Sequence, residues 1–155
     1  MFSKLALAFI AASAAIVNVH AETHTITFTN NCGYGTPYLR DQNGNVLSTG
    51  APYTSNGPIL GAIAYLQTGP CGNNGENCLL VETSLNGEFS STDLSLIPPH
   101  SFQVTSGFGY YNGCDGAGAD CTDPDCPDAM TDPSQTWKQV GCSVPNVDLA
   151  ITFCD

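Results

Sequence analysis

Eight cysteines in a chain of 155 residues constrain this sequence more than any other feature. All of them follow residue 21, and an even number in a small exported chain predicts four disulfides: Cys32, Cys71, Cys78, Cys114, Cys121, Cys126, Cys142 and Cys154. The cysteine positions alone allow 105 pairings. A zinc site is the weaker interpretation, because there is no CxxC pair and His24 and His100 stand far from the cysteines.

The first residues have the pattern of a secretory signal peptide. Lys4 precedes an apolar stretch from 5 to 19, and Val19-His20-Ala21 places small residues where a signal peptidase cleaves. A membrane anchor is the alternative, but about 15 apolar residues are short for the roughly 20 that a spanning helix needs. We therefore expect a signal peptide over 1–21 and a single domain over 22–155, secreted to the extracellular space or the cell wall.

The charge of the chain excludes several classes of partner. Residues 22–155 carry two basic side chains, Arg40 and Lys138, against fourteen acidic ones, so the net charge is 2 − 14 = −12. Binding to nucleic acid needs clustered Lys and Arg, and anionic lipid repels an acidic surface. We expect no nucleic acid, no membrane and no cofactor among the partners, and a monomer.

The patterning predicts an all-β fold. Apolar and polar residues alternate over 24–29, which is typical of a half-buried strand. Further strands are expected over 59–68, 79–85, 94–97, 102–105 and 149–153, separated by turn clusters rich in Gly and Asn. Many short strands of this kind indicate a β-sandwich. The segment 113–133 is rich in Asp and Pro and is expected to be an irregular, disulfide-pinned loop.

Several local patterns, in this order along the chain, resemble thaumatin-like proteins: the start Thr25-Ile26-Thr27-Phe28-Thr29-Asn30-Asn31-Cys32, the stretch 80–97, Asp125-Cys126-Pro127, and the end Val147 to Cys154. The chain is most similar to short acidic members secreted by fungi and labelled glycopeptides, which implies a fungal source. The resemblance implies a thaumatin-like β-sandwich with short loops and a reduced second domain. The family's connectivity implies Cys32–Cys154 and Cys71–Cys78, and by the same logic Cys114–Cys142, which leaves Cys121 with Cys126.

The resemblance also implies an acidic cleft, in which Glu82 and Asp93 are the candidate catalytic residues. A glycosidase needs two carboxyl groups facing one bond, one protonated and one ionised. The rest of the family's cleft departs from the pattern. Pro98 stands where the family's second cleft Asp is expected. The segment 63–67 has no basic residue where the cleft Arg is expected, and Arg40 comes too early in the sequence to replace it with confidence. The alternative is that Glu82 and Asp93 cap turns or face solvent.

Aromatic side chains offer a second, non-catalytic interpretation, because exposed rings stack on the apolar faces of sugars. The candidate carbohydrate-binding residues are Phe108, Tyr110, Tyr111 and Trp137. Core packing beside Cys114 is the alternative for the first three. The sequence thus predicts a cell-wall protein that binds β-glucan and has an antifungal or defence-like role. A weak endo-β-1,3-glucanase and a secreted interaction or protease-inhibitor scaffold are the alternatives.

Six aspartates crowd one segment: Asp115, Asp120, Asp123, Asp125, Asp128 and Asp132. Carboxylate oxygens at this density are the ligands that calcium prefers, but their spacing is not that of an EF-hand. A solvated acidic loop without a metal is therefore the expectation.

Overall fold

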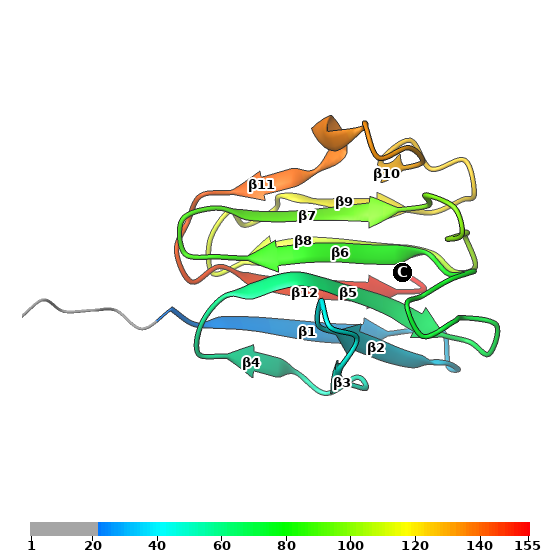
Figure 1. Ribbon diagram of the computed structural model, residues 1–155, viewed down its shortest axis with the longest axis horizontal. Helices are drawn as coiled ribbons and strands as arrows, with labels where there is room; N and C mark the ends of the chain where they lie inside the picture. The colour runs from blue at the N-terminus through cyan, green and yellow to red at the C-terminus, as the bar shows by residue number, and fades with distance from the viewer. Residues whose placement is uncertain (1–21) are drawn as a thin grey trace, which may run out of the picture.

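The computed structural model describes residues 22–155, so the predicted signal peptide lies outside the described residues. Two β-sheets face each other (Figure 1). The first has the order β4-β1-β12-β8-β9, formed by Tyr53–Ser55, His24–Asn30, Asp148–Phe153, Ser106–Tyr111 and Gly118–Cys121. The second has the order β10-β7-β6-β5-β2-β3, formed by Ala129–Met130, Ser90–Ser95, Leu80–Leu85, Ile59–Gln67, Thr36–Arg40 and Val46–Ser48.

Strand β7 has neighbours along its whole length. On one side it pairs with β6, and on the other with β11 (Val140–Cys142) and then with β10. Between β10 and β11 lies η1, a single 3-10 turn over Thr136–Lys138 and the one helical element of residues 22–155. None of the described elements is a helix long and apolar enough to cross a membrane. The β10–η1–β11 segment therefore forms a border beside β7.

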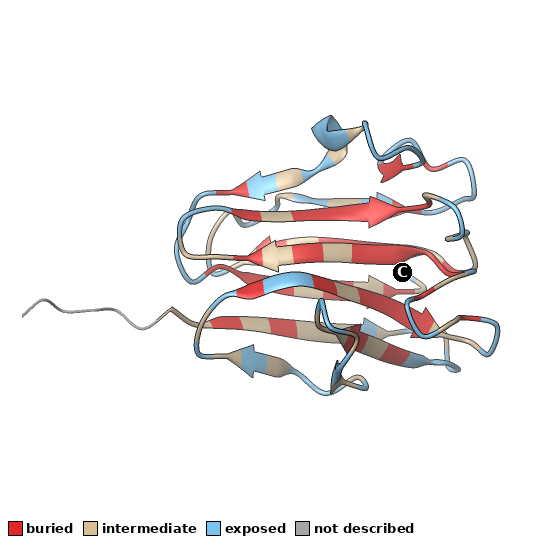
Figure 2. Ribbon diagram, in the orientation of Figure 1, coloured by how far each residue is buried: buried red, intermediate tan, exposed pale blue. Residues whose placement is uncertain are grey.

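Alternating burial along the strands builds the core between the sheets, visible as red and tan bands on β1 and β6 in Figure 2. Apolar side chains of both sheets fill this layer, among them Ile26, Val81, Leu94, Ile151 and Phe153. Because side chains alternate across a strand, the residues between these positions point to the outer faces of the sheets. The outer face of the second sheet is the surface that carries Glu82.

The strands predicted over 24–29, 59–68, 79–85 and 149–153 are confirmed, and each of their ends agrees within one residue. The strand predicted over 94–97 begins four residues earlier, at Ser90. The Ser and Thr residues at the start of β7 look like turn residues in the sequence. In the structure Thr92 is buried, and its Oγ1 lies 2.6 Å from Thr83 Oγ1. A buried hydroxyl with a cross-strand partner is compatible with a central strand.

Two predictions about the second half of the chain are wrong. Residues 102–105 are not a strand; β8 begins at Ser106 and contains Gly107 and Gly109. A side chain on Gly107 would lie 2.8 Å from Asp120 Oδ1 on the neighbouring strand, so the glycine there reflects close strand packing. The segment 113–133 is not wholly irregular, because it contains β9 and β10.

Four disulfides pin the sandwich: Cys32–Cys154, Cys71–Cys78, Cys114–Cys142 and Cys121–Cys126. These are the pairs that the resemblance implies. The first joins the ends of β1 and β12, which are parallel neighbours in the first sheet. The third connects the turn after β8 to β11, and so holds the border beside β7 in place.

Candidate functional site

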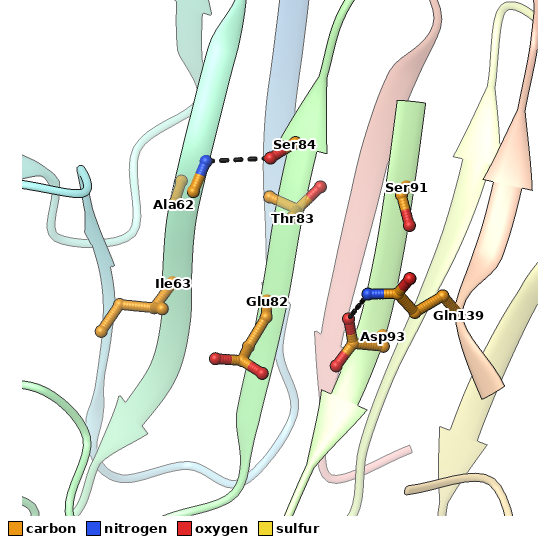
Figure 3. A pocket seen from close by; sticks show the side chains of 9 residues that line it. Ala62, Ile63, Glu82, Thr83, Ser84, Ser91, Asp93 and Gln139 are labelled. Atoms are coloured by element: carbon orange, nitrogen blue, oxygen red, sulfur yellow. Dashed lines mark hydrogen bonds between the residues drawn. The ribbon is translucent and has the colours of Figure 1, made fainter. Parts of the chain in front are cut away.

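Glu82 and Asp93 are direct cross-strand partners on β6 and β7. Their sequence neighbours Val81 and Leu94 point into the core, so the two carboxyl groups lie together on the outer face of the second sheet. Figure 3 shows them at the same level on adjacent strands. Directly opposed residues on antiparallel strands have Cβ atoms about 4.5–5.5 Å apart. The register therefore places the two carboxyl groups side by side on neighbouring strands.

A shallow pocket of about 210 Å³ surrounds this pair. It is lined by Gly61, Ala62, Ile63, Glu82, Thr83, Ser84, Ser91, Asp93 and Gln139. Glu82 and Asp93 are the only titratable residues in that lining. The pocket is smaller than the 300–1,000 Å³ typical of enclosed ligand sites, so it fits part of a ligand rather than a whole one.

Asp93 is the electrostatically strained member of the pair. It is only 4% exposed, and its Oδ1 accepts a 3.3 Å hydrogen bond from Gln139 Nε2. Its Oδ2 is buried and has no hydrogen-bond partner among the described residues. Burial, and then the charge of Glu82, raise the pKa of Asp93 from its ordinary 3.8 to about 6. Asp93 therefore holds its proton into mildly acidic conditions.

Arg40 lies in the same register row as the two carboxyl groups. Arg40 on β2 pairs with Ile63 on β5, Ile63 pairs with Glu82, and Glu82 pairs with Asp93. In the sequence Arg40 comes too early to match the cleft arginine of thaumatin-like proteins. The order of strands nevertheless places it two strand spacings, about 10 Å, from Glu82. The register row Arg40–Ile63–Glu82–Asp93 thus carries both signs of charge.

The guanidinium of Arg40 nevertheless makes its hydrogen bonds with neighbours other than the two carboxyl groups. Its Nε donates to Tyr65 Oη at 3.1 Å and its Nη1 to the Gly44 carbonyl at 2.8 Å. It also lies 5.4 Å from the centre of the Tyr38 ring. Arg40 therefore forms no ion pair with Glu82 or Asp93.

The segment after β7 supplies no carboxylate, as its sequence indicates. Pro98 and Pro99 are exposed, and His100 turns toward the Cys71–Cys78 loop, where its Nδ1 lies 2.9 Å from the Gly75 carbonyl. The pocket instead gains Gln139 from the loop before β11. Sequence reasoning missed Gln139 because it lies 46 residues from its partner Asp93.

Two of the candidate sugar-binding aromatics lie in the core, which is a correction. Phe108 and Tyr110 are 6% and 3% exposed, and their rings pack edge to face. The Tyr110 hydroxyl lies 2.9 Å from both Thr92 Oγ1 and the Val140 carbonyl. Neither ring is available to stack on a sugar, so the core-packing alternative describes them.

The other two aromatics reach the surface at different places. Tyr111 is half-buried, and its position in β8 points it away from the core that holds Tyr110. Trp137 on η1 is 74% exposed and borders a second hollow of about 370 Å³, whose lining also includes Gln139. Lys138 Nζ fixes this turn by donating to the Ala129 carbonyl at 2.6 Å. Trp137 is therefore an exposed ring beside the Asp93 pocket.

The acidic segment shows no arrangement for a metal ion: within residues 22–155 no group of three or more His, Cys, Asp or Glu side chains is placed to hold one. Some of its carboxylates stabilise their own turns. Asp123 Oδ1 accepts from the Asp125 amide, and Asp132 Oδ1 from the Ser134 amide. These contacts describe capped surface turns.

No protein-family model matches the chain. A curated relative, the thaumatin-like pathogenesis-related protein 4 of Avena sativa, is 29% identical over 163 residues, covering 90% of this chain and 92% of the relative. The solved structure of the thaumatin-like xylanase inhibitor TLXI superposes with a TM-score of 0.51 at 20% identity, covering 85% of this chain and 99% of that one. The relative is a plant protein, so the fungal subtype stays a prediction. The chain has the thaumatin-like fold, and its sequence is similar to that of a thaumatin-like relative along nine-tenths of its length.

Proposed function

We propose that this protein is secreted and binds cell-wall polysaccharide, of the β-glucan class, at the Glu82–Asp93 pocket. The observation that carries the proposal is the buried, unpartnered Asp93 Oδ2 in a polar pocket that is open to solvent. A polar atom left unpaired in a folded protein costs stability, and a ligand that pairs with it recovers that cost on binding.

The chemistry of the pocket suits sugar hydroxyls. Glu82 and Asp93 offer acceptor oxygens, and Ser84 and Ser91 add hydroxyls that both donate and accept in the same lining. Because the pocket holds about 210 Å³, it accommodates one ring or its substituents while the rest of the chain lies across the sheet. This arrangement supports binding along a polymer rather than enclosure of a small molecule.

The biological setting follows from two further observations. Four disulfides are typical of an oxidising compartment, which supports export by the signal peptide predicted over 1–21. The curated relative is named as a pathogenesis-related protein, which supports a defence-like role.

The test is a pull-down of the purified protein by insoluble β-1,3-glucan, xylan and chitin, repeated with Glu82→Gln and Asp93→Asn. We expect retention on β-glucan that both substitutions weaken. Asp125→Asn is the matched control, because it removes one exposed carboxylate that is not part of the pocket lining. Failure of every polysaccharide to retain the protein would overturn the proposal and favour an inhibitor or interaction role, for which the name of the structural neighbour offers a starting point.

A second candidate is weak hydrolysis of β-1,3-glucan by the same pair. The feature that favours it is the pKa of Asp93, which burial and the neighbouring Glu82 raise to about 6. Retaining glycosidases hold their two carboxyl groups about 5–5.5 Å apart, a spacing that direct cross-strand partners allow. Hydrolysis predicts new reducing ends from soluble β-1,3-glucan and their loss in Glu82→Gln; pure protein that releases none is a binder only.

A further inference from the structure

We propose that the Glu82–Asp93 pocket selects glycans that carry free amino groups, such as glucosamine units in deacetylated chitin, by seating the ammonium group between the two carboxylates. The inference rests on the proposed function, since it assigns the same polysaccharide-binding pocket a preference among cell-wall glycans. It follows from an excess of negative charge and an unpaired acceptor at one point of the surface.

The negative charge of the pocket has no counter-ion within residues 22–155. Only two Lys or Arg side chains exist there, and both donate to uncharged oxygens: Arg40 to Tyr65 Oη and the Gly44 carbonyl, Lys138 to the Ala129 carbonyl. In this part of the chain the single ion pair joins His24 and Glu22, remote from the pocket lining. Glu82 and Asp93 therefore repel each other with no cation between them, only the Gln139 amide on Asp93 Oδ1, and that repulsion is one cause of the raised pKa of Asp93.

The unpaired acceptor is Asp93 Oδ2, in a residue that is 96% buried and lines the pocket. An ammonium group carries three donors and one positive charge. The lining of this one pocket offers it the carboxyl groups of Asp93 and Glu82 and the Ser91 hydroxyl, all of which can accept hydrogen bonds. A neutral sugar hydroxyl supplies one donor and no charge, so it satisfies this site less completely.

The long-range field acts in the same direction. Residues 22–155 carry a net charge of −12, which attracts a polycationic chain before contact. The pocket then decides where an amino group docks, because charge-assisted hydrogen bonds are about twice as strong as neutral ones. An N-acetyl group removes both the charge and two of the three donors, which makes acetylation a clean probe of this contact.

The test compares soluble glucosamine oligomers with N-acetylglucosamine oligomers of equal length, by calorimetry on the mature protein near neutral pH. We expect the free-amine oligomers to bind roughly tenfold more tightly or better, as one charge-assisted hydrogen bond implies. Glu82→Gln and Asp93→Asn should each remove most of the preference, whereas Asp125→Asn, with the same change in net charge, should keep it.

Three outcomes separate the inference from its premise. Equal affinity for the two oligomers overturns the inference and, if β-glucan is still retained, leaves the proposed function intact. A preference that Asp125→Asn reduces as much as Glu82→Gln also overturns it, because the attraction is then general. Binding to no glycan at all overturns both.

Discussion

Asp93 faces Glu82 across the β6–β7 pair and is the more deeply buried of the two. The chain thus places a carboxyl group at the floor of a pocket, beside a like charge, with one oxygen unpaired. Such an arrangement lowers the stability of the folded state at neutral pH. A fold that tolerates it has the signature of a functional site, where stability is given up for binding or chemistry.

The first prediction concerns Asp93→Asn and pH. The folded-state pKa of Asp93, about 6, lies above its ordinary value of 3.8, so the folded protein binds the extra proton between these values. Stability from this group is therefore full below about pH 4 and is lost as pH rises through about 6. At pH 7.5 Asp93→Asn should be more stable than the parent by about 2 to 3 kcal/mol, and at pH 4 equal to it.

Urea unfolding of both proteins across this pH range measures the difference. The comparison is made at each pH because the pKa of Asp120 is also raised, by burial and by Asp155, and that effect cancels between variant and parent. Asp125→Asn is the control and should track the parent. If Asp93→Asn were less stable than the parent at pH 7.5, the prediction would be wrong. The hydrogen bond from Gln139 would then be enough to stabilise the ionised Asp93.

Strand prediction succeeded where burial and polarity agree. In β1 the alternation of Thr with Ile and Phe matches the half-buried strand that the structure contains. It failed at Thr92, whose buried hydroxyl pairs with that of Thr83, and at Ser106, whose buried hydroxyl donates to the Val104 carbonyl, because such residues look solvent-exposed in a sequence. The segment 113–133, which is rich in Asp and Pro, offered the weakest periodic signal.

The candidate site was only half accessible to sequence reasoning. Glu82 and Asp93 lie on a β-hairpin, and their pairing needs only a local turn. The position of Arg40 depends on β2 pairing with β5, and that of Gln139 on the border held by Cys114–Cys142. Long-range register of this kind leaves no local trace, so neither residue could be placed from spacing.

A second prediction tests the start of the described chain. The His24 ring is fully buried, with Nδ1 2.6 Å from the Val147 carbonyl and Nε2 2.9 Å from Glu22 Oε1. His24→Leu leaves both oxygens without this partner and should lower the free energy of unfolding by about 2 to 4 kcal/mol. Denaturant unfolding at neutral pH measures the loss. The milder Glu22→Gln, which keeps a side-chain acceptor, should cost less; the reverse order would contradict this account.

A third prediction ranks the disulfides. Cys32–Cys154 spans 122 residues and Cys71–Cys78 only 7. In the chain-entropy description, removing the first by paired Cys→Ser substitution should cost about 5 kcal/mol and removing the second about 2 kcal/mol. Guanidinium unfolding midpoints of the two double variants give the order. Equal losses would mean that native contacts, not chain entropy, set the contribution of each bridge.

The final prediction separates Trp137 from the buried aromatics. Because its indole is 74% exposed, Trp137→Ala should change stability by less than about 0.5 kcal/mol, whereas Tyr110→Ala in the core should cost about 3 kcal/mol or more. Trp137 borders the hollow that shares Gln139 with the Asp93 pocket, so its loss should weaken retention on β-glucan. Tyr34→Ala removes another exposed ring, 58% accessible and absent from both linings, and should leave retention unchanged. If Trp137→Ala and Tyr34→Ala weakened retention on β-glucan equally, the effect would come from general stacking on surface rings, and Trp137 would not belong to the site.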